Sequence, residues 1–211
     1  MRANGALRAL QAVIAFTRVT PNVLTAIGFL GVIASGILIL ERQWFAAGLV
    51  YVTFSLADSL DGTLARYQGT ASTFGAFLDS TLDRAAEGVI LGAVGITLGQ
   101  DGSHWALGAC FVALTASFLV SYSRARSEGL GIDSNKGGLM GRPERLVLTG
   151  AGIFMAPLGS VLEVSIFVLA ALSLMTAVQR VIHVRNALTR AGTGIPSGEP
   201  PTTTDQESHA Q

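Results

Sequence analysis

Charged residues are scarce in this sequence, since Asp, Glu, Lys and Arg make up only 13% of its 211 residues. A soluble globular domain usually has about a quarter of its residues charged. Half of the residues are hydrophobic, the mean hydropathy is +0.52, and the apolar residues gather into long runs. The shortage of charge therefore excludes an ordinary soluble domain and indicates a polytopic membrane protein.

Cysteine and histidine are nearly absent as well. The single cysteine, Cys110, excludes a disulfide bond within the chain. The histidines, at positions 104, 183 and 209, lie far apart in the sequence, so we expect no zinc site. The formal net charge is zero, and we expect no nucleic-acid partner.

Six hydrophobic stretches have lengths close to the ~20 residues that cross a bilayer core of ~30 Å. They cover roughly residues 22–40, 44–66, 73–98, 104–126, 141–158 and 161–186. We therefore expect an all-α, polytopic membrane protein in which residues 21–190 form one domain of six transmembrane helices.

The two terminal segments differ from this domain. Residues 1–20 carry Arg2, Arg8 and Arg18 among apolar side chains. This pattern predicts a juxtamembrane amphipathic helix on the bilayer surface, with an ordinary basic leader as the alternative. Residues 191–211 are rich in Pro, Thr and Gly, and we expect a disordered tail.

Basic residues are distributed unevenly among the loops. The first, third and fifth loops contain only Arg42, whereas most other basic residues lie at the termini or near the second and fourth loops. Positive residues favour the cytoplasmic side of a membrane. We therefore expect a protein of the cytoplasmic membrane with both termini in the cytoplasm.

Four aspartates lie at the cytoplasmic ends of the second and third stretches. Asp58 and Asp61 are three residues apart, and Asp79 and Asp83 are four apart, so each pair shares one helix face. The short link at 67–72 makes these two spans antiparallel neighbours. All four carboxylates are therefore expected to meet at one depth, on the cytoplasmic side.

Carboxylates gathered in a low dielectric need a counter-charge, because even one charge at the centre of a span costs ~3 kcal/mol on insertion scales. Hard carboxylate oxygens suit Mg²⁺ or Mn²⁺, and four of them suffice for two bridged ions, as in enzymes that displace groups at phosphorus. Gly62 and Gly75 leave room for a bulky polar ligand such as a nucleotide. Arg66 is placed to pair with a phosphate or to brace an aspartate.

Other functions for these acids stay open at this point. They can form salt bridges or caps near the interface, with Arg66 and Arg84 as available partners. They can also belong to a small ion or proton transporter, although such a protein should carry acids through the whole membrane depth. A non-catalytic membrane scaffold would not need an acid-rich crevice. Glu87, one turn after Asp83, either tunes that residue or pairs with Arg84.

The same stretch resembles the signature of the CDP-alcohol phosphatidyltransferase family, D-x2-D-G-x2-A-R-x8-G-x3-D-x3-D. The matching residues are Asp58, Asp61, Gly62, Ala65, Arg66, Gly75, Asp79 and Asp83. The resemblance extends over about residues 18–186. It implies that an alcohol hydroxyl attacks the lipid-linked phosphate of CDP-diacylglycerol, that CMP leaves and that a phospholipid forms.

The resemblance also implies roles for single residues. Asp58, Asp61 and Asp79 would hold two metal ions, Mg²⁺ or Mn²⁺. Asp83 would complete the shell of the second ion and act as the general base. The donor nucleotide would lie against Asp61, Gly62, Arg66 and Gly75. A homodimer is what the family suggests.

Arginines from three further helices indicate an anionic acceptor. The motifs "Y-x-[KR]-A-R-x-E" at 122–128, "RPERL" at 142–146 and "QR" at 179–180 resemble the branch that makes phosphatidylinositol phosphate from inositol 1-phosphate. By this likeness Arg124, Arg145 and Arg180 would bind the phosphate of the acceptor. Glycerol 3-phosphate, and hence phosphatidylglycerophosphate synthesis, is the alternative.

The remaining basic residues of this side have a simpler explanation, since the positive-inside rule and contact with headgroups account for them. They are Arg126, Arg142, Arg185 and Arg190. Two small-xxx-small pairs in the third stretch, Gly88–Gly92 and Gly95–Gly99, predict close helix packing, either within the bundle or across a dimer. Packing within the bundle is the favoured interpretation.

Overall fold

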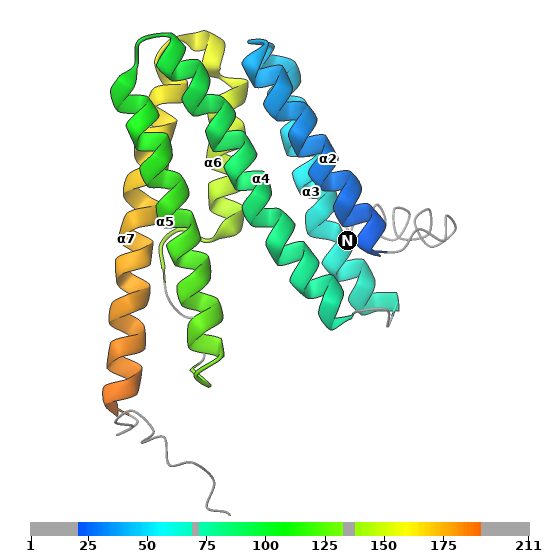
Figure 1. Ribbon diagram of the computed structural model, residues 1–211, viewed down its shortest axis with the longest axis vertical. Helices are drawn as coiled ribbons and strands as arrows, with labels where there is room; N and C mark the ends of the chain where they lie inside the picture. The colour runs from blue at the N-terminus through cyan, green and yellow to red at the C-terminus, as the bar shows by residue number, and fades with distance from the viewer. Residues whose placement is uncertain (1–20, 69–71, 133–137, 191–211) are drawn as a thin grey trace, which may run out of the picture.

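The computed structural model describes residues 21–68, 72–132 and 138–190, and for Pro21 and residues 57–68 it describes the backbone alone. These residues form six α-helices and one short 3-10 helix, without a β-strand (Figure 1). They are α2 (Pro21–Leu40), α3 (Trp44–Gln68), α4 (Thr73–Gln100), α5 (His104–Glu128), α6 (Arg142–Phe154), η1 (Ala156–Leu158) and α7 (Val161–Arg190). The all-α prediction is confirmed for the described residues. The expected N-terminal helix at 1–20 and tail at 191–211 lie outside them.

The helix positions follow the hydrophobic stretches closely, but not every helix is both long and apolar enough to cross a membrane. By length and composition, α2 (from Asn22 onward), α5 and α7 qualify as membrane spans among the described residues. The expected fifth span at 141–158 is instead divided into α6, with 13 residues, and η1. Pro157 and Gly159 account for this break, because proline lacks an amide hydrogen and Gly159 has a φ of +89°.

The helices form two groups that α4 connects. On one side α2 packs against α3, and on the other α5 packs against α7. In Figure 1, α4 runs diagonally between these groups and contacts both α2 and α5. Helix α6 packs against α3 and α7. The core between them includes the fully buried side chains of Ile39, Ile90, Ile153, Ile166 and Leu169.

Glycines of α4 serve different purposes along its length. A Cβ atom added at Gly95 or Gly99 would lie 3.1–3.2 Å from Leu107 of α5, so these glycines permit the close crossing of α4 and α5. The prediction of packing within the bundle is therefore confirmed for this pair. It is wrong for Gly88 and Gly92, because a Cβ atom there would meet nothing within 4 Å in the described structure.

Polar contacts fasten the end of the bundle that lies opposite Asp83. Arg42, in the turn after α2, donates hydrogen bonds of 2.8 and 2.7 Å to the two carboxylate oxygens of Asp101, in the turn after α4. Ser103 donates a hydrogen bond of 2.6 Å to Glu163 in the first turn of α7. These contacts join three segments that are distant in sequence, and leave the other end of the bundle to carry the acidic and basic residues of the site.

Apolar side chains cover much of the outer surface. Trp105 and Phe111 of α5 are 87% and 72% exposed, and large exposed hydrophobic residues occur on the other long helices too. Such a surface is unfavourable in water and suits the hydrocarbon of a bilayer. Together with the long apolar helices, it identifies a membrane protein.

Candidate active site

The acidic motif lies where α3 ends and α4 begins. Asp58 and Asp61 are on α3, and Asp79 and Asp83 are in the first half of α4. The side chains of Asp58, Asp61, Gly62 and Arg66 lie outside the described residues. The meeting of all four carboxylates therefore stays a prediction. Asp79 is half-buried and Asp83 is buried, with 8% of the residue exposed.

Gly75 sits in the first turn of α4, where space is limited. Ser72 caps this helix, since its hydroxyl accepts a hydrogen bond of 2.9 Å from the amide of Gly75. A Cβ atom at position 75 would lie 3.0 Å from both Asn22 Oδ1 and Ser72 Oγ. Glycine thus allows the start of α4 to lie close against the start of α2.

Asp83 is held by arginines from two helices. Arg142, in the first turn of α6, donates a hydrogen bond from Nη2 to Asp83 Oδ1. Arg84 Nη2 lies 3.6 Å from Asp83 Oδ2. From sequence we expected Arg142 only to satisfy the positive-inside rule and to contact headgroups, so this contact with the aspartate is a correction to that interpretation.

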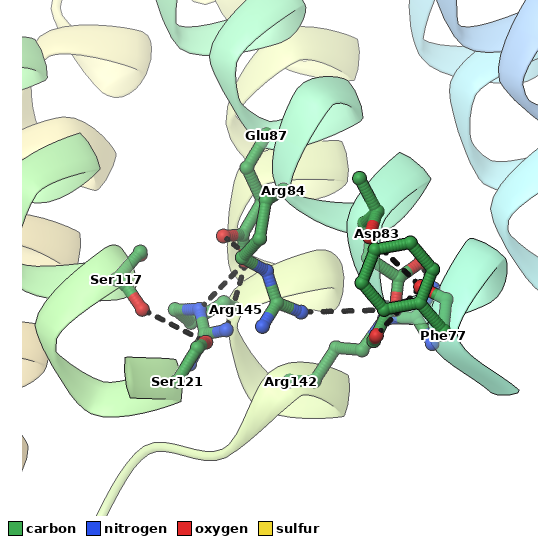
Figure 2. A network of polar contacts seen from close by, with 10 residues as sticks. Phe77, Asp83, Arg84, Glu87, Ser117, Ser121, Arg142 and Arg145 are labelled. Carbon is green, nitrogen blue, oxygen red and sulfur yellow. Dashed lines mark hydrogen bonds and ion pairs between the residues drawn. The ribbon is translucent and has the colours of Figure 1, made fainter. Parts of the chain in front are cut away.

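Glu87 makes a parallel contact one turn further along α4. Arg145 donates to Glu87 Oε1 from Nε at 3.0 Å and from Nη2 at 2.8 Å. Arg84 Nε lies 3.6 Å from Glu87 Oε2. The expected pairing of Glu87 with Arg84 is therefore present. The shorter contact of Glu87, with Arg145, was not expected from the sequence. Figure 2 shows these charged side chains in one network.

A spacing signal for this network exists in the sequence. Asp83 and Glu87 are four residues apart on α4, and Arg142 and Arg145 are three apart on α6, so each pair lies on one helix face. Two acids on one helix face and two arginines on another predict a double ion pair, once the two helices are known to face each other. The sequence alone does not supply that last condition.

These side chains line a cavity of about 50 Å³ among the helices. Asp83 and Glu87 of α4 and Arg142 and Arg145 of α6 contribute charged groups to its wall, and Val32 and Leu91 contribute apolar ones. The two carboxylates and two guanidinium groups in this wall balance in formal charge. Arg84, which lies near both carboxylates, adds one positive charge to the network around the cavity.

Arg180 of α7 belongs to the same basic region. Repulsion from Arg124 and Arg145 acts on its charge, and Glu128 partly offsets this repulsion. Its Nε and Nη1 atoms are buried and have no hydrogen-bond partner within the part of the chain that the structure describes. Arg124 itself pairs with Glu128 at 2.9 Å and is half exposed. The structure thus brings together the three arginines that the sequence singled out.

The segment before α6 fixes the arginines of that helix relative to α7. The amide of Leu139 donates to Gln179 Oε1 at 3.2 Å, and the amide of Met140 donates to Thr176 Oγ1 at 3.1 Å. Gly138 has a φ of +127°, and a Cβ atom there would lie 2.5 Å from Thr176 Cγ2. Only glycine fits so close to α7 in this conformation.

The donor atoms present suit a hard divalent cation. Asp79 and Asp83 provide carboxylate oxygens one turn apart on α4, and oxygen ligands are what Mg²⁺ and Mn²⁺ prefer. Among the described side chains, no group of three or more His, Cys, Asp or Glu is close enough to hold a metal ion. A complete ligand set would need Asp58 and Asp61 as well.

Comparison with known proteins identifies similar sequences over most of the chain. The family model for CDP-alcohol phosphatidyltransferase matches residues 18–191. The phosphatidylinositol phosphate synthase of Streptomyces avermitilis is 38% identical over 177 residues, covering 79% of this chain and 72% of the relative. The archaetidylinositol phosphate synthase of Pyrococcus horikoshii is 39% identical over 171 residues, covering 81% and 86%.

Solved structures agree with these sequence matches. A crystal structure of Mycobacterium tuberculosis phosphatidylinositol phosphate synthase with CDP-DAG bound has a TM-score of 0.77 and 30% sequence identity, and the match covers 84% of this chain and 92% of that one. The same enzyme in complex with manganese and citrate has a TM-score of 0.76 at 30% identity, with 85% and 88% covered.

Proposed function

The chain belongs to the CDP-alcohol phosphatidyltransferase family, and from its basic site we propose that it is a phosphatidylinositol phosphate synthase. It transfers the phosphatidyl group of CDP-diacylglycerol to the hydroxyl of inositol 1-phosphate and releases CMP. Relatives that carry this name, and a neighbour crystallised with CDP-DAG, support the choice of both substrates.

The surroundings of Arg180 carry the choice of a phosphorylated acceptor. Two of its guanidinium nitrogens are buried without a hydrogen-bond partner in the described structure, beside the like charges of Arg124 and Arg145. Buried cations without partners are unfavourable, and a phosphate oxygen would satisfy them. An acceptor that carries a phosphate group fits this region, whereas a zwitterionic or neutral alcohol would bring no phosphate oxygen to the buried nitrogens of Arg180.

Two divalent ions are proposed to lie among Asp58, Asp61, Asp79 and Asp83. The ions are Mg²⁺ or Mn²⁺, and a structural neighbour contains manganese. When bound, they neutralise the pyrophosphate of the donor and favour departure of CMP. Asp61, Gly62, Arg66 and Gly75 are proposed to hold the donor nucleotide.

Asp83 is proposed to take the proton from the acceptor hydroxyl. It lines the cavity, and Arg142 from α6 holds its carboxylate. A carboxylate that acts as a general base must lie within hydrogen-bond reach of the proton it removes. The contact with Arg142 limits the directions in which this carboxylate can point, which favours one attack geometry.

The proposed arrangement in the membrane has six spans, the fifth formed by α6 and η1 together, and places both termini and the site on the cytoplasmic side. The excess of basic residues at the Asp83 end of the bundle supports this orientation. The proposed assembly is a homodimer, following what the resemblance to the family implies.

The test of this function is release of CMP by the purified protein. The protein is incubated with CDP-diacylglycerol, Mg²⁺ and one acceptor at a time: inositol 1-phosphate, glycerol 3-phosphate, free inositol or serine. We expect fast release with inositol 1-phosphate alone. Preference for glycerol 3-phosphate would instead identify a phosphatidylglycerophosphate synthase. Release with serine or free inositol only would contradict the anionic acceptor, and no release at all would favour the transporter alternative.

A further inference from the structure

Glu87 has no place in the aspartate motif or in the chemistry proposed above, yet it lies in the wall of the cavity. Its side chain is 19% exposed, and it faces Arg145, whose side chain is 6% exposed. A carboxylate this deep in a membrane protein is costly unless it is paired, and such residues are functional more often than structural. The geometry of its contacts indicates what it does.

The two hydrogen bonds from Arg145 use one edge of the guanidinium group. Nε and Nη2 both donate to the same oxygen, Glu87 Oε1, at 3.0 and 2.8 Å. A guanidinium group carries five N–H bonds: one on Nε and two on each terminal nitrogen. Glu87 therefore occupies the Nε–Nη2 edge. One hydrogen of Nη1 and the second hydrogen of Nη2 lie side by side on the Nη1–Nη2 edge, and this edge can bind a phosphate in bidentate fashion.

A second arginine attracts the carboxylate of Glu87 without a hydrogen bond in the described structure. Its other oxygen, Oε2, is 3.6 Å from Arg84 Nε, a distance too long for a hydrogen bond but short enough for attraction between the charges. Arg84 also lies 3.6 Å from Asp83. Glu87 thus lies between Arg84 on its own helix and Arg145 on α6, and it accepts hydrogen bonds from Arg145.

We propose that Glu87 is a positioning residue, which grips the Nε–Nη2 edge of Arg145 so that the opposite end of the guanidinium faces the phosphate of the acceptor. The inference rests on the proposed function, because it assigns Arg145 to an anionic acceptor. Pre-orientation of Arg145 reduces the side-chain entropy that is lost when the acceptor binds. Loss of this orientation therefore weakens binding of the acceptor more than binding of the donor.

The test compares Glu87→Gln with the native chain in CMP release. Glutamine keeps the shape of the side chain but removes its charge. We expect the KM for inositol 1-phosphate to rise roughly tenfold, as for loss of one charge-assisted hydrogen bond, while kcat and the KM for CDP-diacylglycerol change less than about twofold. Asp101→Asn, which also removes a carboxylate paired with an arginine but at the opposite end of the bundle, is the matched control and should leave both KM values unchanged.

A double-mutant cycle separates positioning from a general structural effect. In an Arg145→Ala background, Glu87→Gln should raise the acceptor KM no further, because the group that it orients is gone. The proposal would be overturned if the two substitutions had multiplicative effects on the acceptor KM, or if the donor KM rose equally. If Glu87→Gln does not fold, Glu87→Asp keeps the charge on a shorter arm and should show a smaller rise in the same constant.

A binding measurement tests the inference without turnover. Inorganic phosphate should raise the thermal unfolding temperature of the native protein in detergent, and raise it less in Glu87→Gln. An equal rise in both proteins overturns the positioning role. Failure of the proposed function looks different, because the native chain would then release no CMP with a phosphorylated acceptor.

Discussion

Arg142 of α6 donates a hydrogen bond to Asp83 of α4, a residue 59 positions earlier in the chain. The aspartate proposed as general base is thus held by an arginine from another helix. Helix α6 itself packs against α3 and α7, and its long side chains reach α4 at the wall of the cavity. The orientation of Asp83 therefore depends on a residue outside the aspartate motif.

Substitution of Arg142 tests this dependence. Arg142→Ala should lower kcat by roughly 10- to 100-fold, because a misplaced catalytic group loses much of its effect. The KM for CDP-diacylglycerol should change little. Arg142→Lys should recover part of the activity, and Arg190→Ala, at the exposed end of α7, serves as the control. Full activity in Arg142→Ala would mean that Asp83 needs no support from α6.

Asp83→Asn tests the general base itself. The amide has almost the same shape as the carboxylate but cannot accept the proton of the acceptor hydroxyl. We expect kcat to fall by about 100-fold or more, while binding of CDP-diacylglycerol, measured by calorimetry, is largely kept. Near-normal turnover would remove Asp83 from this role.

The acceptor arginines are tested by separate substitution of Arg145 and Arg180. Each change to alanine should raise the KM for inositol 1-phosphate about 10- to 100-fold, since hydrogen bonds between charged groups contribute ~1.5–3 kcal/mol. The donor KM should rise much less. Equal effects on the two constants would show that these arginines do not distinguish the acceptor from the donor.

The contact between Arg42 and Asp101 predicts a dependence of stability on pH. The hydrogen bonds from Arg42 lower the pKa of Asp101 below the ordinary value of 3.8, and Asp101 raises the pKa of Arg42. A lowered carboxyl pKa stabilises the fold above the unfolded pKa, and this contribution is lost as pH falls through the folded pKa. Asp101→Asn should lower the unfolding temperature slightly at neutral pH, because exposed ion pairs contribute little. The difference should vanish in acid, and a difference that persists there would exclude this electrostatic origin.

Much of the fold follows from hydrophobicity alone. Runs of apolar residues predicted α2, α3, α4 and α5 to within a few residues at each end, because a helix that crosses a bilayer needs a continuous apolar surface. The prediction for the fifth stretch was less accurate. Hydrophobicity does not register that Pro157 and Gly159 interrupt helical hydrogen bonding, so the expected span at 141–158 is a short helix followed by a 3-10 turn.

Residues of the candidate site that stand out by type or by motif were predictable from the sequence, whereas the contacts between α4 and α6 were missed. Asp79 and Asp83 stand out because acids are rare in such helices. Arg142 did not stand out, since a basic residue at a cytoplasmic helix end already has an explanation in the positive-inside rule. Only the packing of α6 against its neighbours reveals that Arg142 and Arg145 meet Asp83 and Glu87.

The most direct measurement of the central claim is the identity of the lipid product. The purified protein is incubated with CDP-diacylglycerol, Mg²⁺ and inositol 1-phosphate, and the lipids are examined by mass spectrometry with Asp83→Asn in parallel. The account predicts phosphatidylinositol phosphate in equal amount to the CMP released, abolished by a chelator and nearly absent with the variant. Unchanged CDP-diacylglycerol with the native protein, or the same product from Asp83→Asn, would contradict it.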